Sequence, residues 1–226
     1  MRLWAEFEKG PRLRHIGHLD LMRAMQRALR RSGTPVDYSK GYNPHILLSF
    51  ASALSVGASG EHELMEVTLQ EDESPRVFQQ QMNQALPEDL MIRNSGILPE
   101  GSAPLMARVV AAQWSIYIFD QAQRTKLLQV IPEWEHQEWI PGFRKTKSGM
   151  KECNLKPLIL DLSILQDETI SMILSQEEGS TCKPSMVLES LKEACDLGEM
   201  PRMEIRRNHL LTRNSLHELI PLELTL

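Results

Sequence analysis

Apolar and polar residues change their spacing several times within the first forty positions. Residues 2–9, RLWAEFEK, alternate between apolar and polar in a way that predicts a strand. After the turn-like pair Gly10-Pro11 the spacing becomes helical from His18 to Arg31. Gly33 suits the left-handed position that ends a helix, and Pro35 follows closely.

The next sixty residues continue as short extended segments and one helix. VDYS, ILLSFA and ELMEVTLQ read as strands, and LMIRNSGIL closes the series as another. DESPRVFQQQMNQAL reads as a helix, in which Ser74 can cap the start and Pro75 can take the first position. The resulting order of strand, helix, strand pair, helix and strand is the split βαβ pattern.

The second half repeats this rhythm without aligning residue by residue. Predicted strands are QWSIYIFD, LKPLILDLSIL, TISMILSQ and MPRMEIRR, and predicted helices are QAQRTKLLQVIPE and KPSMVLESLKEAC. Between them, WIPGFRKTKSGMKECNL reads as a hairpin that turns at Lys147-Ser148-Gly149. Around Gly96–Pro104 the composition shifts to Gly, Pro and Ser. We therefore expect an α+β protein of two tandem ferredoxin-like units with antiparallel sheets, over residues 1–100 and 105–226.

Composition and cysteine use narrow the class of protein. The hydrophobic fraction of 42% and the charged fraction of 24% are typical of a folded globular chain. No apolar run is long enough to span a bilayer, and the N-terminus lacks the apolar core of a signal peptide, so we expect a cytoplasmic protein without membrane contact. Cys153, Cys182 and Cys195 form no C-x-x-C pair, which argues against a disulfide framework or a closed zinc site.

Charge is distributed unevenly along the chain. The net charge is −5, yet Pro11 to Phe50 contains seven basic and two acidic residues. Such a region is typical of contact with an anionic partner such as RNA, although a solvated helix face gives the same count. With the hairpin, whose basic strand carries Phe143, the candidate nucleic-acid contacts are Arg12, Arg14, Arg23, Arg27, Arg30, Arg31, Lys40, Arg144, Lys145 and Lys147. Arg202, Arg206 and Arg207 form a third basic spot.

A helical wheel separates the histidine of the first helix from its arginines. His18 falls on the same side as Met22, Met25 and Leu29, which predicts a core-facing stripe. Asp20 and the arginines at 23, 27, 30 and 31 fall on the opposite side, where Asp20 can pair with Arg23.

His15 precedes this helix and is the better candidate for a base. Metal-independent RNA cleavage needs a base and an acid, roles that His15, His18 and Tyr42 could fill if the loop SKGYNPH folds over the helix start. His15, His18, Asp20 and His45 could in principle hold a metal, but no paired metal motif is present, so we expect neither a metal nor a cofactor. Phosphate-binding glycine motifs are also absent, and the glycines at 41, 57 and 60 are expected in turns.

Residues 12–69 contain a set of short motifs: the HLD of the first helix, ALRR, the YS and GYNP segments, SFA and the Gly57–Glu63 turn. Through these motifs the chain resembles a bacterial family of radical S-adenosylmethionine-linked proteins of unknown function, which stand beside or are fused to a radical S-adenosylmethionine protein. The motif residues are His18, Asp20, Tyr38, Ser39, Gly41, Asn43, Pro44, Gly57 and Glu63. The second half matches through FRKTKSGMKECNLKP, and the sequence departs from the expected pattern at Glu66, Asn154 and Lys156.

The resemblance implies a partner more than an activity. The chain has no C-x-x-x-C-x-x-C, the spacing that holds the radical enzyme's cluster, so it cannot be that enzyme. The resemblance implies a non-catalytic accessory protein that binds or presents an RNA of the tRNA or rRNA type. Two alternatives stay open: a metal-independent endoribonuclease similar to the CRISPR-repeat-processing enzymes, and a protein–protein adaptor without nucleic acid.

Overall fold

The computed structural model describes residues 1–146 and 149–226. Its described residues form an α+β structure with five α-helices and a large, mostly antiparallel sheet. They divide into two compact units, one of residues 1–109 with 207–226 and the other of residues 110–206.

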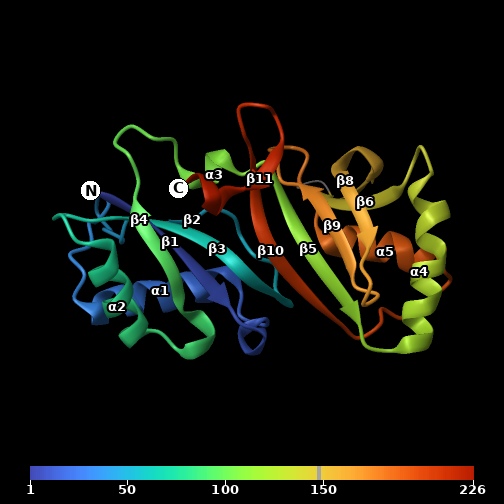
Figure 1. The fold of residues 1–226 in the computed structure, drawn as a ribbon, viewed down its shortest axis with the longest axis horizontal. Helices are drawn as coiled ribbons and strands as arrows, with labels where there is room; N and C mark the ends of the chain where they lie inside the picture. The colour runs from blue at the N-terminus through green and yellow to red at the C-terminus, as the bar shows by residue number, and fades with distance from the viewer. Residues whose placement is uncertain (147–148) are drawn as a thin grey trace. The chain divides into compact units, whose positions relative to one another are not determined.

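The first unit builds its sheet around its first strand. β1 (Arg2–Lys9) pairs antiparallel with β3 (Ala58–Thr68) on one side and with β4 (Ile92–Ile97) on the other, as Figure 1 shows. β2 (Leu48–Phe50) pairs antiparallel with β3. The order β4-β1-β3 continues into β10 (Met203–Arg213), which pairs with β11 (Leu219–Pro221). The helices are α1 (His18–Ser32), α2 (Pro75–Ala85) and α3 (Leu105–Arg108).

Two helices cover one face of this sheet. Leu3, Ala5 and Phe7 of β1 are fully buried in a cluster with residues of α1 and α2. Alternate residues of a strand point to opposite faces, so Glu6 lies on the other face of the sheet. The helices thus cover one face of the sheet, and the carboxylate of Glu6 lies on the opposite face.

The ends of α1 follow the predicted signals. The helix begins after Gly17 and ends at Gly33, whose φ of 78° is left-handed. Met25 and Leu29 are fully buried, as predicted, while His18 and Met22 are partly exposed. Leu21 and Ala28 are buried as well. The buried side of the helix is therefore centred closer to Leu21 and Ala28 than the helical wheel predicted.

The second unit carries its own strands, helices and hairpin. β5 (Ala111–Ile118), β9 (Ile170–Ser175) and β8 (Ile159–Ile164) pair antiparallel in that order. The helices are α4 (Gln121–Glu135) and α5 (Pro184–Ala194), and the hairpin consists of β6 (Pro141–Thr146) and β7 (Gly149–Asn154). Asp120 caps α4 through the backbone N–H of Gln123, and buried Trp134 donates to the hydroxyl of Ser190 at 3.2 Å.

Most predicted elements are confirmed, with differences at the edges. Pro75 takes the first position of α2, but the Ser74 side chain makes no capping hydrogen bond. VDYS contributes only single bridges at Val36 and Tyr38, and α3 and β11 were not predicted. The predicted turn at Lys147-Ser148 lies outside the described residues. The units also differ from the predicted division, because residues 207–226 join the first unit.

None of the helices among the described residues combines the length and the apolar character that crossing a bilayer would require.

Two adjacent residues of α2 allow a test of which side of this helix packs into the core. Phe78 is fully buried and Val77 is exposed. We expect Phe78→Ala to lower the free energy of unfolding by about 3–5 kcal/mol because it leaves a cavity. Val77→Ala should stay within about 0.5 kcal/mol of the wild type. Urea denaturation of both variants checks this, and equal losses would contradict the packing described.

Candidate nucleic-acid interface

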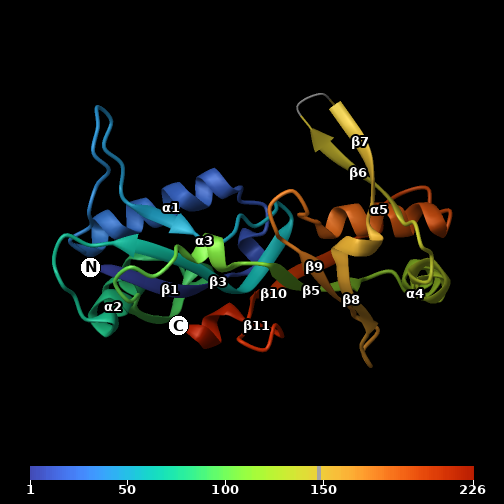
Figure 2. The ribbon, with the colours of Figure 1, turned by 90° about the horizontal axis from the view of Figure 1, so that it is seen from above.

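A row of arginines follows the side of α1 opposite to its buried residues, and Figure 2 shows this helix alongside the strands of the first unit. All four side chains are exposed, and we call them the arginine face: Arg23, Arg27, Arg30 and Arg31. Arg23, Arg27 and Arg31 are each four positions apart, so they form a row about 12 Å long. Guanidinium groups bind phosphate oxygens in a bidentate manner, and such a row can follow a phosphate backbone.

Neighbouring groups occupy part of this basic region. Arg23 pairs with Asp20 at 3.0 Å, as predicted, and Arg31 donates to the carbonyl of Ala85 at 2.6 Å. Both Arg23 and Asp20 are about two-thirds exposed, which makes the pair weak and easily exchanged for a phosphate.

The other predicted cations around α1 differ in whether a neighbouring group binds them. Arg12 pairs with Asp89 at 2.9 Å, and Arg14 donates to the carbonyl of Pro11 at 3.2 Å. Lys40 is exposed in the loop after α1. Arg27, Arg30 and Lys40 have no ion-pair partner among the described residues and are the cations most available to an anion.

A buried lysine holds the segments that lead into α1. Lys9, 1% exposed, lies at the end of β1 and donates to the carbonyl oxygens of Arg14 at 3.3 Å, Ile16 at 3.0 Å and Ala58 at 3.2 Å. These three bonds satisfy every N–H of the ammonium group. Burial lowers the pKa of Lys9, and the charge of Glu63 acts in the opposite direction.

Glu63 and Arg207 form a bidentate ion pair inside the same unit. The guanidinium donates to the two carboxylate oxygens at 2.8 and 2.5 Å, and the side chains are 1% and 4% exposed. Arg207 also donates to the Ser52 hydroxyl and to the carbonyl oxygens of Ser52 and Ala53. The predicted basic spot at Arg207 is therefore wrong, because this guanidinium is buried and paired.

Together Lys9, Glu63 and Arg207 form what we call the buried charge cluster. It binds residues 14–16 through Lys9 and residues 52–53 through Arg207, and the N–H of Gly57 donates to the carbonyl of Arg14 at 2.7 Å. Gly60 lies against Glu63, and a Cβ there would overlap the carboxylate. Two loops at the start of α1 are thus fixed from inside the unit.

The three predicted catalytic residues have different surroundings. His15 is exposed in the loop before α1, whereas the His18 ring packs edge-on against Phe50, with ring centroids 5.5 Å apart. The Tyr42 side chain is fully exposed and so contacts neither histidine. The assignment of His15, His18 and Tyr42 to catalysis stays a prediction, since the structure does not bring Tyr42 to the other two.

Two of the motif residues, His18 and Asp20, lie on α1, and the others fall into two groups. Gly57, with φ of 92°, lies in one of the fixed loops, and Glu63 of β3 belongs to the buried charge cluster itself. The segment from Tyr38 to Pro44 forms a narrow projection, closed where Ser39 bonds to His45 through backbone and side chain. Gly41, Tyr42, Asn43 and Pro44 are exposed there, which is typical of residues that act in binding rather than in packing.

The three predicted cations of the hairpin in the second unit differ from the arginines of α1. Arg144 donates to the carbonyl oxygens of Gly179 and Thr181, so it secures β6 rather than facing a phosphate. Nothing is described of the Lys145 side chain, and Lys147 lies outside the described residues. Of the three predicted cations on the hairpin, Arg144 is thus engaged by the backbone, and the side chains of the other two are not described.

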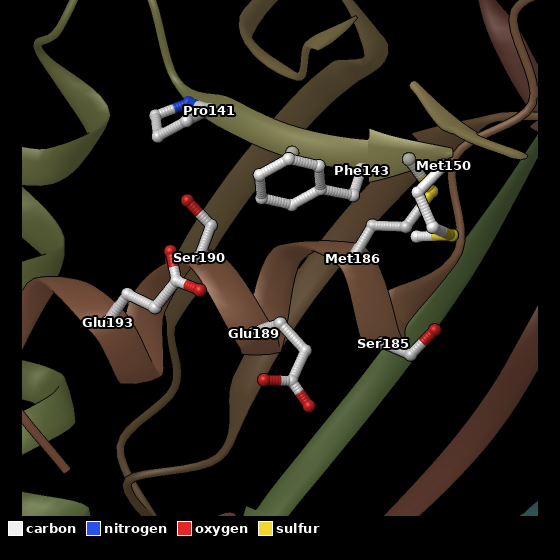
Figure 3. Close-up of a pocket in the computed structure, with 9 residues that line it drawn as sticks. Pro141, Phe143, Met150, Ser185, Met186, Glu189, Ser190 and Glu193 are labelled. Atoms are coloured by element: carbon white, nitrogen blue, oxygen red, sulfur yellow. The ribbon is translucent and has the colours of Figure 1, made fainter. Parts of the chain in front are cut away.

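A pocket of about 400 Å³ lies between this hairpin and α5. Figure 3 shows Phe143 and Met150 of the hairpin beside Met186 of α5, and the same helix contributes Glu189 and Glu193 to the lining. The described residues that line the pocket include these two carboxylates and no cationic side chain, which disfavours a phosphate there. The arginine face is therefore the stronger candidate for a nucleic-acid contact.

The positions that depart from the expected pattern make structural contacts. Glu66 pairs with Arg2 at 2.9 Å and accepts the N–H of Leu105 at 3.0 Å. The Asn154 side chain accepts the N–H of Ile140 at 2.9 Å and that of Lys156 at 3.0 Å. Both residues thus connect chain segments within their own unit.

Among the described residues one group of three could hold a metal, and it is His62, His209 and Glu223. His15, His18, Asp20 and His45 do not form such a group. Burial raises the pKa of Cys182 to about 12, which leaves that thiol inert as a nucleophile or ligand.

Comparison with known families covers most of the chain. The family described as "Uncharacterized protein conserved in bacteria (DUF2344)" matches residues 2–184. The chain belongs to this family. No curated protein matches the chain. The match includes α1, the projecting loop and the hairpin, and it stops before Arg207.

Removing the charge of one member of the buried charge cluster should strongly destabilise the protein. We expect Glu63→Gln to lower the free energy of unfolding by about 3–5 kcal/mol, because Lys9 and Arg207 keep their charges without a buried counter-charge. Asp20→Asn, which breaks the exposed pair with Arg23, should cost less than about 1 kcal/mol. Urea denaturation measures both, and a near-neutral Glu63→Gln would contradict the role assigned to the cluster.

Proposed function

We propose that this protein is a non-catalytic accessory of a radical S-adenosylmethionine protein and binds its RNA substrate, of the tRNA or rRNA type, through the arginine face of α1. The observation that carries this proposal is the exposed row of guanidinium groups on a helix whose start is fixed by the buried charge cluster. A rigid cationic row in a chain of net charge −5 favours a polyanion at one place on the surface.

The radical S-adenosylmethionine partner is supported by the resemblance of residues 12–69 alone. The chain itself lacks the cysteine spacing of a radical enzyme, and Cys182 is fully buried. In this proposal the partner carries out the radical chemistry and this chain binds the substrate.

We also assign both units to the ferredoxin-like fold. The antiparallel order β4-β1-β3, with β2 on β3, supports this for the first unit. The order β10-β5-β9-β8, with the hairpin inserted before β8, supports it for the second. In this arrangement the helices lie on one face of each sheet, and α1 carries its arginines on the side away from the strands.

The endoribonuclease alternative has less support. A base and an acid must both reach the reacting phosphate group, and Tyr42 stands alone at the tip of its loop. Wild-type protein incubated with RNA in EDTA is expected to leave the RNA intact. Cleavage that disappears in His15→Ala would favour the nuclease instead.

RNA binding tests the arginine face directly. We expect labelled tRNA and a single-stranded oligonucleotide to bind the wild-type chain with a strong salt dependence in fluorescence anisotropy. Replacing Arg23, Arg27 and Arg31 by Ala should weaken binding at least tenfold, and for the single strand it should reduce the slope of log K against log salt by roughly 2.

The matched control removes the same number of charges elsewhere. Arg76, Lys126 and Lys183 are exposed and lie outside the arginine face, and their triple Ala variant should bind RNA nearly as the wild type does. Equal weakening of RNA binding in both triple variants would show that the effect comes from net charge and not from the arginine face. Unchanged binding in the α1 variant would refute the proposal.

The partner is tested separately from RNA. The tagged full chain is purified from its own bacterium after ribonuclease treatment and at high salt. We expect mass spectrometry to identify a protein with the C-x-x-x-C-x-x-C motif, and we expect the reverse purification to recover this chain. Failure in both directions would remove the radical S-adenosylmethionine part of the proposal and leave RNA binding to stand by itself.

A further inference from the structure

Two imidazole rings lie against each other in the first unit. His62 of β3 and His209 of β10 stack with ring centroids 4.6 Å apart and an angle of 11° between their planes. Each is about one-third exposed, at 32% and 28%. Two parallel imidazoles repel each other when both are protonated, so the arrangement calls for neutralising neighbours.

Each ring is held by a carboxylate that is itself almost buried. Glu6 of β1 accepts or shares the Nδ1 proton of His62 at 2.6 Å, and its side chain is 10% exposed. Glu223, from the short helical turn at Leu222–Thr225, bonds in the same way to Nδ1 of His209, and its side chain is 8% exposed. Two imidazoles thus stand in front of two inner carboxylates.

The second oxygen of Glu223 is the unexplained atom of this site. Oε2 is buried and has no hydrogen-bond partner among the described residues. A buried carboxylate oxygen that has lost water and gained no donor is unfavourable by an amount comparable to a lost hydrogen bond. A cation bound at this oxygen would remove that penalty.

The main-chain support for Glu223 is firm. Leu222 is fully buried, and the hydroxyl of Thr225 accepts from Arg108 at 2.6 Å and donates to the carbonyl of Leu222 at 2.7 Å. The carboxylate is therefore already in place next to the imidazoles.

The charge around His209 is negative. The hydrogen bond from Glu223 raises the pKa of His209 above its ordinary value, against the opposing effect of burial. The charges of Glu223, Glu61 and Glu6 raise it further. The carboxylates of Glu6 and Glu223 are bonded to the two imidazoles, so a cation bound between these side chains would lie next to negative charge.

The donor atoms are close enough to share one ion. His62, His209 and Glu223 each offer one ligand atom, and these atoms lie within 4.8 Å of one another. With bonds of about 2.0–2.2 Å, the ligand atoms of a tetrahedral site lie roughly 3.3–3.5 Å apart. Side-chain rotations that close the gaps by an ångström or so are sufficient, and both histidines have a solvent-exposed edge that allows them.

We propose that His62, His209 and Glu223 bind a divalent transition metal of the zinc class, with Glu6 positioning His62. Imidazole nitrogens with one carboxylate select such metals over Mg²⁺ or Ca²⁺. Two histidines and one glutamate leave a fourth position for water or a substrate atom. The ion would also connect the turn at Leu222–Thr225 to β3 and β10.

Direct metal titration of the full chain tests the site. The protein is stripped with EDTA, and Zn²⁺ is added in a calorimeter while Co²⁺ serves as a spectroscopic probe. We expect one equivalent of Zn²⁺ to bind with proton release, and Co²⁺ to give the intense visible absorption of a four-coordinate site. The fitted stoichiometry and the absorption spectrum are independent readouts, and neither depends on RNA.

Single substitutions then assign the ligands. His209→Ala and Glu223→Gln should each weaken Zn²⁺ at least a hundredfold, and Glu6→Gln should weaken it about 10–100-fold because it removes the partner of a metal-bound histidine. His136→Ala, a change at an exposed histidine of α4's C-terminal end, should leave the affinity unchanged.

Circular dichroism checks the fold of each variant, and Glu223→Gln keeps nearly the shape of the natural side chain. The proposal is overturned if wild-type protein binds no Zn²⁺ and gives no Co²⁺ absorption. It is equally overturned if folded His209→Ala and Glu223→Gln bind both metals as the wild type does.

Discussion

The first unit depends on three charges that it keeps out of water. Lys9, Glu63 and Arg207 come from three strands. Lys9 and Arg207 donate to backbone carbonyl oxygens of two loops at the start of α1, and Glu63 accepts from Arg207. Buried charges are tolerated only when each is paired and hydrogen-bonded, so the loops cannot move without leaving a charge unsatisfied. The position of α1, and with it the direction of its arginines, follows from this constraint.

The sheet of the first unit separates two kinds of chemistry. Leu3, Ala5 and Phe7 face α1 and α2, and the outer side of α1 presents cations to the solvent. Glu6, one position from Ala5 and Phe7, points to the other face and holds His62. A proposed polyanion site and a proposed cation site can therefore coexist in one small unit because a strand sends neighbouring residues in opposite directions.

Sequence reasoning succeeded where the information is local. Periodicity identified Met25 and Leu29 as core residues, placed the arginines of α1 outside, and positioned Gly33 and Pro75 at helix ends. It failed where distant segments meet. Glu63 and Arg207 are 144 positions apart, and His62 and Glu6 are 56 apart, so no spacing rule could connect them. A lysine ending an otherwise buried strand, as Lys9 does, was the one local sign of the cluster.

Amide hydrogen exchange tests most directly whether the buried charge cluster holds the two loops. In wild-type protein the N–H of Gly57, bonded to Arg14, should be protected from exchange. In Glu63→Gln this protection and that of residues 14–16 should fall by at least tenfold more than the protection of β1 and the interior of α1. Equal loss across the unit, or unchanged protection at Gly57, would contradict the account.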